Sequence, residues 1–140
     1  MTDTIKRAEQ VVSGMLAKDE FSRWLGIEVT GLKPAWCVCR MTVRDEMVNG
    51  FGVAHGGIVF SLADSAFAFA CNTQGRIAMS IENGITYPRP VHPGDALTAV
   101  ATEESGTYRL GFFRVVVTNQ KDETVGIFRG TVYKTSQEHP

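Results

Sequence analysis

Residues Asn49 to Asn72 read NGFGVAHGGIVFSLADSAFAFACN, a glycine-rich loop that passes into an almost wholly apolar run from about Gly57. The apolar side chains of this run would cover every side of a helix, which is typical of a helix buried in a core. One carboxylate, Asp64, stands in the middle of it. An ionised group removed from water is costly unless it is paired or used, so Asp64 is a candidate functional residue.

The polar side chains of this predicted helix recur at spacings of three and four residues and form one narrow stripe. They are Ser61, Asp64, Ser65 and Asn72, with the small Ala68 between them. At the helix start, Gly56 and Gly57 leave the first N–H groups bare, and the helix dipole there favours negative charge. Such groups can hold a developing oxyanion. Asn49 and His55 flank the same turn and are candidate side-chain donors.

The spacing between these two features predicts an assembly. Gly56 and Asp64 are eight residues apart, which is about 12 Å of helix rise. A group that attacks a carbonyl held at the helix start must come within about 3–3.5 Å of the carbonyl carbon. One chain cannot supply both parts to one substrate, whereas two antiparallel copies of the helix related by a two-fold axis can. We therefore expect a homodimer with shared active sites.

This region of the sequence resembles the hotdog-fold acyl-CoA thioesterases, and it is most similar to the PaaI type of phenylacetate degradation. The residues that carry the likeness are Asn49, His55, Gly56, Gly57 and Asp64, the stretch FSLADSAFAFACNTQG, Arg89-Pro90, and IFRG at Ile127 to Gly130. The likeness spans about residues 10 to 134. It implies a curved sheet around the central helix and hydrolysis of a phenylacetyl- or hydroxyphenylacetyl-CoA to a free acid and CoA. CoA is then part of the substrate, and no cofactor is implied.

The roles of the motif residues keep alternatives open. By resemblance Asp64 is a general base on water or a nucleophile that forms a mixed anhydride, and otherwise it is a structural carboxylate bonded to backbone or Ser61. Asn49 forms a tight turn or, by resemblance, positions the thioester carbonyl or the surroundings of Asp64. His55 either ties down the loop or contacts the substrate. Ser80 lies where some related thioesterases carry a water-orienting hydroxyl, and otherwise it is an ordinary strand serine.

The resemblance also assigns a CoA site. It puts Arg89 and Pro90, in the segment YPRPVHPG, beside the pantetheine and nucleotide. A guanidinium suits phosphate, although a solvated arginine is equally typical of such a segment. Related proteins place the turn Ser105-Gly106-Thr107-Tyr108 near the same ligand. The arginines or lysines that bind the phosphates stay open. Three aromatic side chains are candidates for an aryl pocket, with core packing as the alternative, namely Phe60, Phe67 and Phe69.

Two other functions are alternatives. An acyl-CoA hydratase or dehydratase of the same fold would typically carry its acid–base residues in a different motif before the helix, so the mid-helix Asp64 argues against it. A non-catalytic acyl-CoA-binding regulator would need an attached effector or DNA-binding module, for which 140 residues leave no room.

Composition sets the wider bounds. The chain is 44% hydrophobic and 21% charged, which predicts one compact domain over residues 1–140. We expect a helical segment at 1–25, and the resemblance implies a hotdog core at 26–134. The net charge of −1 gives no reason to expect nucleic acid. MTDTIKRAEQ lacks an apolar signal core and no run reaches the length of a membrane span, so we expect a cytoplasmic protein without a membrane partner.

The cysteines and histidines indicate no metal site. Cys37, Cys39 and Cys71 cannot all pair within the chain and are expected to be reduced core thiols. The three histidines show no ligand spacing.

Periodicity and turn residues predict an α+β protein in which a long buried helix is followed by an antiparallel meander. We expect helices at residues 4–18 and 19–25 and strands at 26–33, 35–44, 77–88, 96–104, 109–119 and 124–134.

We further expect the dimers to pair into a homotetramer, a dimer of dimers.

Overall fold

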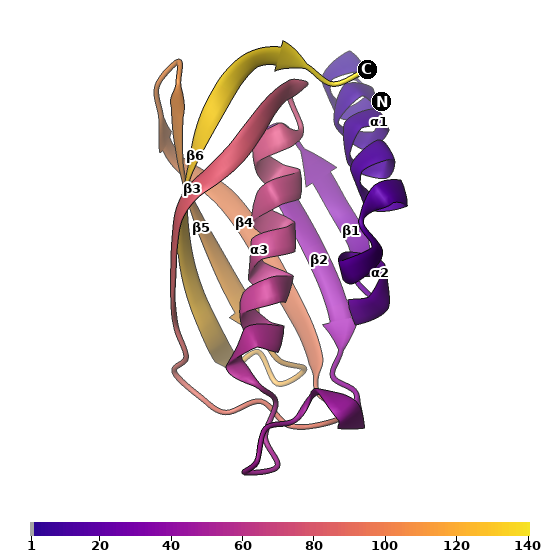
Figure 1. Ribbon diagram of the computed structural model, residues 1–140, viewed down its shortest axis with the longest axis vertical. Helices are drawn as coiled ribbons and strands as arrows, with labels where there is room; N and C mark the ends of the chain where they lie inside the picture. Colours follow the sequence, from indigo (N-terminus) through magenta and orange to yellow (C-terminus); the bar gives the residue numbers. More distant parts are fainter. Residues whose placement is uncertain (1) are drawn as a thin grey trace.

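The computed structural model describes residues 2–140 and places one sheet around one central helix (Figure 1). In chain order the elements are α1 (Asp3–Lys18), α2 (Glu20–Leu25), β1 (Glu28–Lys33), β2 (Trp36–Thr42), the 3₁₀ helix η1 (Asp45–Met47), α3 (Gly56–Asn72), β3 (Arg76–Thr86), β4 (Ala96–Gly106), β5 (Leu110–Thr118) and β6 (Thr124–Glu138). The expected helices and strands are therefore confirmed in number and order, and η1 is an addition. None of the helices in residues 2–140 has the length and apolar character needed to cross a membrane.

The sheet has six strands in the order β1-β2-β4-β5-β6-β3, and every neighbouring pair is antiparallel. Figure 1 shows the sheet curling around α3, while α1 and α2 lie beside α3 and β1. This arrangement confirms the α+β class and the curved sheet. It also leaves β3, the strand that directly follows α3, at one edge of the sheet.

The inner face of the sheet and α3 form the core. Phe67 and Phe69 are almost completely buried, and the Phe67 ring packs at 5.4 Å from Phe128. Phe60 lies at 5.4 Å from the same ring. A side chain at Gly130 would place its Cβ 2.6 Å from Phe67, so the missing side chain gives that ring its space. Phe67 and Phe69 are thus core residues and Phe60 packs partly buried against the core, in agreement with the core packing that was the alternative to an aryl pocket.

The N-terminal helices end at residues that the sequence identifies. Asp19 caps α2 by accepting the backbone N–H of Ser22, and Gly26 ends it with φ +78°. A left-handed residue of this kind stops a helix without the steric cost of a Cβ. Gly26 therefore belongs to the helix end, and β1 starts at Glu28 instead of residue 26. At the other end of the chain, β6 continues past residue 134 because it pairs with β3 as far as Glu138.

Candidate active site

The start of α3 is organised by His55. Its Nδ1 accepts the backbone N–H of Gly57 at 2.9 Å, so the ring caps the helix. Because Nδ1 is the acceptor, the proton of the neutral ring lies on Nε2. The expectation that both glycine N–H groups are bare is wrong for Gly57, whose N–H is already occupied. The Gly56 N–H makes no hydrogen bond with any residue from 2 to 140, so it is the one available to a ligand.

Gly56 is held from its carbonyl side by Tyr87. The phenol hydroxyl donates to the Gly56 carbonyl at 2.8 Å. A Cβ at Gly56 would lie 3.1 Å from the Tyr87 Oη and 3.2 Å from its Cζ. The close approach therefore needs glycine, and it fixes the orientation of this peptide unit. Sequence reasoning missed Tyr87, because nothing in YPRP indicates that its ring turns back to the helix start.

Asn49 forms the tight turn that was one of its two expected roles. Its Oδ1 accepts the N–H of Phe51 at 2.9 Å, and its carbonyl accepts the N–H of Gly52 at 3.1 Å. Gly52 has φ +79°. The Asn49 side chain therefore shapes the loop that leads to His55, while its NH₂ group makes no hydrogen bond with any of the described residues.

Asp64 lies half-buried two turns into α3, on the side of the helix that the sheet leaves open. Its Oδ1 accepts a hydrogen bond from the Asn83 carboxamide of β3 at 3.3 Å. Burial, followed by the negative charge of Asp19, raises the pKa of the Asp64 carboxyl above its ordinary value. A half-buried carboxylate with a raised pKa and one neutral donor is a candidate for acid–base or nucleophilic chemistry.

The other members of the polar stripe stabilise the fold. Ser61 donates to the Gly57 carbonyl at 2.6 Å, and Ser65 lies 2.8 Å from the hydroxyl of Ser22. Asn72 is buried and bonds both the N–H and the carbonyl of Ala78. These three side chains are neutral and hydrogen-bonded within the chain, so Asp64 is the ionisable member of the stripe.

Ser80 joins this arrangement through Asn83. The Ser80 hydroxyl donates to the Asn83 Oδ1 at 2.8 Å, and Asn83 in turn donates to Asp64. The three side chains form one continuous chain of hydrogen bonds from β3 to α3. Asn83 was not among the residues picked from the sequence. A register shift between Ser80 and Glu82 changes which β3 residues face the helix, so simple alternation could not place it.

The residues expected to hold CoA form two groups that lie at opposite ends of the folded chain. Arg89 and Pro90 belong to the β3–β4 connection, near the start of α3, and the Arg89 guanidinium donates to the Thr124 carbonyl at 3.1 Å. Ser105, Gly106, Thr107 and Tyr108 form the β4–β5 hairpin at the far end of β4, near the end of α3 (Figure 1). Within a single chain the structure does not bring these two groups together.

Cationic side chains lie around the β4–β5 hairpin, and the sequence did not show which of them would do so. The Arg76 guanidinium lies 4.2 Å from the centre of the Tyr108 ring, and that of Arg109 lies 4.9 Å from the same ring. Lys134 lies nearby, with its Nζ 3.3 Å from Glu103 and 3.4 Å from the Thr107 carbonyl. Aromatic and cationic groups in this arrangement suit a nucleotide base and its phosphates.

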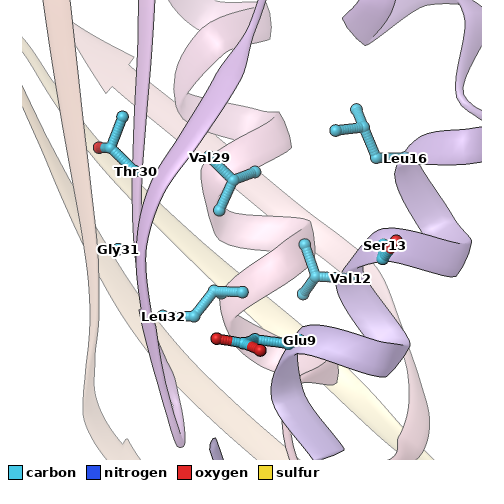
Figure 2. A pocket seen from close by; sticks show the side chains of 8 residues that line it. All are labelled: Glu9, Val12, Ser13, Leu16, Val29, Thr30, Gly31 and Leu32. Carbon is cyan, nitrogen blue, oxygen red and sulfur yellow. The ribbon is translucent and has the colours of Figure 1, made fainter. Parts of the chain in front are cut away.

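Several grooves flank the N-terminal helices, among them one against β1 and one that reaches the start of α3. The groove in Figure 2, about 370 Å³, separates α1 from β1 and is lined by Val12 and Leu16 on one side and Val29 and Leu32 on the other. None of the site residues lines it, so we do not assign the chemistry to it. A second groove of about 390 Å³ runs from α2 to the start of α3 and includes His55 and Gly57.

Among residues 2–140 no cysteine is hydrogen-bonded to Asp64, His55 or Gly56. Cys37 and Cys39 are buried with their Sγ atoms 3.8 Å apart, and the hydrogen bond between them, with burial, raises the pKa of Cys39. Burial raises the pKa of Cys71 to about 12. All three are free thiols. In residues 2–140 no three His, Cys, Asp or Glu side chains gather in a way that would hold a metal ion.

Comparison with known proteins agrees with this geometry. The sequence profile of the Thioesterase superfamily matches residues 51–126, which contain α3 and most of the site. The chain is 38% identical over 128 residues to the acyl-coenzyme A thioesterase PaaI of Escherichia coli K12, covering 91% of each chain. It is 30% identical to the human acyl-coenzyme A thioesterase 13, covering 86% of this chain and 88% of that one.

A solved structure gives the same result for the fold. The structure of the E. coli PaaI protein from the phenylacetic acid degradation operon superposes with a TM-score of 0.94 and 35% identity, covering 97% of this chain and 99% of that one. The hotdog fold expected from the sequence is thereby confirmed.

Proposed function

The chain belongs to the thioesterase superfamily, and to its PaaI type, and we propose that it is a thioester hydrolase that converts an aromatic acyl-CoA to a free acid and CoA. The observation that carries the proposal is the half-buried Asp64, which lies on the open side of α3 with a raised pKa and a single neutral donor. The aromatic acyl group is supported by the likeness to the E. coli protein of the phenylacetic acid degradation operon.

We propose that each active site is built from two chains. Asp64 and Gly56 lie on one straight helix, eight residues apart, so about 12 Å of rise separates them. A two-fold axis that pairs two α3 helices antiparallel would bring Asp64 of the partner subunit to the free Gly56 N–H. The small Ala68 in the open stripe favours such a close approach.

The edge strand β3 supports the same assembly. It has eleven residues, and its Met79 and Ile81 side chains are 61% and 60% exposed. A long edge strand with exposed apolar side chains is a template for pairing with another chain. Pairing of β3 with its copy would place the two α3 helices on the same side of one continuous sheet. We propose that such dimers pair further into a tetramer.

The chemical step follows from the positions of these groups. The thioester oxygen accepts the Gly56 N–H, which stabilises the negative charge that develops when the carbonyl carbon is attacked. Asp64 either removes a proton from the attacking water or attacks the carbon itself and forms a mixed anhydride that water then opens. In both routes the C–S bond breaks and the thiolate of CoA leaves and takes up a proton. Neither route calls for a metal ion or a redox cofactor.

Several neighbours hold this geometry. Asn83 orients the carboxylate of Asp64, and Ser80 in turn orients Asn83. His55 occupies the Gly57 N–H, and Asn49 shapes the preceding turn. We propose that the unused Nε2–H of His55 and NH₂ of Asn49 face the substrate, and that Ser80 also contacts the attacking water.

CoA would lie across both chains. Because the two-fold axis turns the partner's β4–β5 hairpin towards this chain's α3 start, Arg89 and Pro90 of one chain and Ser105 to Tyr108 of the other can border one ligand. We propose that Arg76 and Arg109 bind its phosphates, since they flank Tyr108. Free thiols fit a reducing compartment, so we place the enzyme in the cytoplasm.

A thiol-release assay with phenylacetyl-CoA, hydroxyphenylacetyl-CoA and aliphatic acyl-CoAs tests the activity. We expect release of CoA that is fastest with the aryl substrates, and a loss of about 10²- to 10⁴-fold in Asp64→Ala. Full activity of Asp64→Ala would remove the mechanism. If an enoyl-CoA is instead hydrated without thiol release, the enzyme is a hydratase.

A mixing experiment tests the shared site. Asp64→Ala and Gly56→Ala chains are each expected to be impaired, yet a mixed dimer has one site that carries neither change. After complete subunit exchange of equal amounts, about a quarter of all sites should be intact. No recovery of activity, once exchange is demonstrated with labelled chains, would contradict a site made from two chains.

A further inference from the structure

Two large aromatic side chains on the short helix α2 are exposed to solvent. Phe21 is 54% exposed and Trp24 is 51% exposed, and their rings stack with centroids 6.0 Å apart and an interplanar angle of 18°. Single exposed apolar residues are common, but a stacked and exposed pair is a recognition feature.

The pair is held rigidly. Asp19 and Gly26 fix the two ends of α2, and Leu25 between them is completely buried. The Arg44 guanidinium also lies against the Trp24 ring, 4.8 Å from the ring centre. A ring that is fixed before a ligand arrives loses little freedom when the ligand binds.

The pair forms one wall of the groove that leads to the start of α3. This groove has a volume of about 390 Å³, which lies within the usual range for small-molecule sites. Its apolar lining includes Met47 and Ile58, and its lining also includes His55 and Gly57 from the start of α3. A ligand that enters it therefore reaches the helix start that carries the available N–H of Gly56.

The charge of the groove defines what can occupy it. The carboxylate in its lining, Glu46, is paired with the Arg44 guanidinium at 2.7 Å. No unpaired charge among the described residues of the lining is thus available to a charged acyl group, so an apolar, flat group fits best.

We propose that this groove is the acyl subsite, in which the aryl ring of the substrate packs against Phe21 and Trp24 while its thioester carbonyl reaches the Gly56 N–H. The inference rests on the proposed thioesterase function and names the residues that select its substrates. Phe21 and Trp24 are exposed to a ligand, whereas Phe67 and Phe69 are buried in the core.

A binding measurement tests the groove without turnover. The chain has two tryptophans, so Trp36→Phe leaves Trp24 as the only one. Combined with Asp64→Ala, this variant should show a change in tryptophan emission on titration with phenylacetyl-CoA and a much smaller change with acetyl-CoA, which lacks the ring. An equal response to both ligands, or none to either, would overturn the proposal.

Selectivity provides a second measurement. Trp24→Leu should lower kcat/KM for phenylacetyl-CoA by about tenfold, with little change for acetyl-CoA. Phe112→Leu, an exposed aromatic on β5 outside the groove, is the matched control and should leave both values unchanged. The proposal is wrong if Trp24→Leu lowers kcat/KM equally for both substrates, or if it dissociates the assembly without altering selectivity. Either result would mean that a second copy of the chain fills the groove.

The two proposals can fail separately. If wild-type protein cleaves no thioester, the proposed function fails, while the emission titration still decides whether the groove binds an aryl group. If thioesters are cleaved but Trp24 neither responds nor selects, the function stands and the subsite is overturned.

Discussion

The carboxamide of Asn83 donates to the carboxylate of Asp64 across the space between β3 and α3, at 3.3 Å. Within residues 2–140 this is the one side-chain hydrogen bond that Asp64 makes, and Ser80 steadies it from behind. The carboxylate is thus oriented by a neutral donor, which favours its ionised form without neutralising it.

Asn83→Ala should lower kcat by about 10- to 10²-fold and leave KM nearly unchanged, because a hydrogen bond to a charged group contributes about 1.5–3 kcal/mol. The acidic limb of the pH profile should move to higher pH, since the ionised form of Asp64 loses its donor. Glu82→Gln, an exposed neighbour on β3, is the control. Unaltered kcat and an unaltered pH profile would show that Asn83 has no part in positioning Asp64.

Asp64→Asn should lower activity by about 10²- to 10⁴-fold and raise the free energy of unfolding at neutral pH. Because folding raises the pKa of this carboxyl, the ionised wild-type group destabilises the fold once the pH exceeds that pKa. The difference between variant and wild type should shrink as the pH falls towards the ordinary value of 3.8. Urea unfolding at pH 7 and pH 4 measures it, and a variant that is less stable at pH 7 would refute the sign.

Asp19→Asn should move the acidic limb of the kcat/KM profile to lower pH, since the like charge of Asp19 is the second cause of the raised pKa of Asp64. Asparagine caps a helix about as well as aspartate, so α2 should persist. Glu20→Gln, in the first turn of the same helix, removes an equal charge and serves as the control. The same shift in both variants would point to a general charge effect instead.

Gly56→Ala should lower kcat by about 10²- to 10³-fold, the usual loss for an oxyanion donor, because its Cβ would meet the Tyr87 ring and displace the peptide. In a Tyr87→Ala background the same change should cost much less. Gly50→Ala, in the same loop with open space around its Cβ, should be nearly neutral. Equal losses from Gly56→Ala in both backgrounds would rule out the steric coupling.

Gly130→Ala should lower the free energy of unfolding by about 1–3 kcal/mol, as overpacking a core does. Its Cβ would lie 2.6 Å from Phe67 and 3.0 Å from Phe128. Gly84→Ala, on β3 with nothing near its Cβ, should leave stability nearly unchanged. Denaturant unfolding of both variants compares them, and equal midpoints would mean that Phe67 has room to move.

Much of the fold follows from local patterns. The all-round apolar run up to Asn72 predicts α3 within one residue of its start, since such a run can only lie inside a core. Asp19 and Gly26 likewise predict α2, because a side-chain cap and a left-handed glycine act on their own helix. Features that depend on neighbours in sequence can therefore be predicted from the sequence alone.

The site could be predicted only in part, because the residues that bond to Asp64 and Gly56 are distant from them in the sequence. Asp64 is visible as a charge in an apolar run, but its donor Asn83 depends on a register shift in β3. Tyr87 reaches Gly56 from 31 residues away. The roles of Phe67 and Phe69 stayed open between an aryl pocket and core packing, because a pattern shows that they are apolar without showing which side of the helix a ligand can reach.

The low reactivity of the native thiols has a practical use. Cys37 and Cys39 are sealed between sheet and helix, and the pKa of about 12 at Cys71 keeps its thiolate scarce at neutral pH. A single cysteine introduced at the exposed Ser13, as Ser13→Cys, would react with a maleimide dye ahead of all three. Subunit exchange and opening motions could then be followed by energy transfer between fluorophores in a chain that keeps its native cysteines.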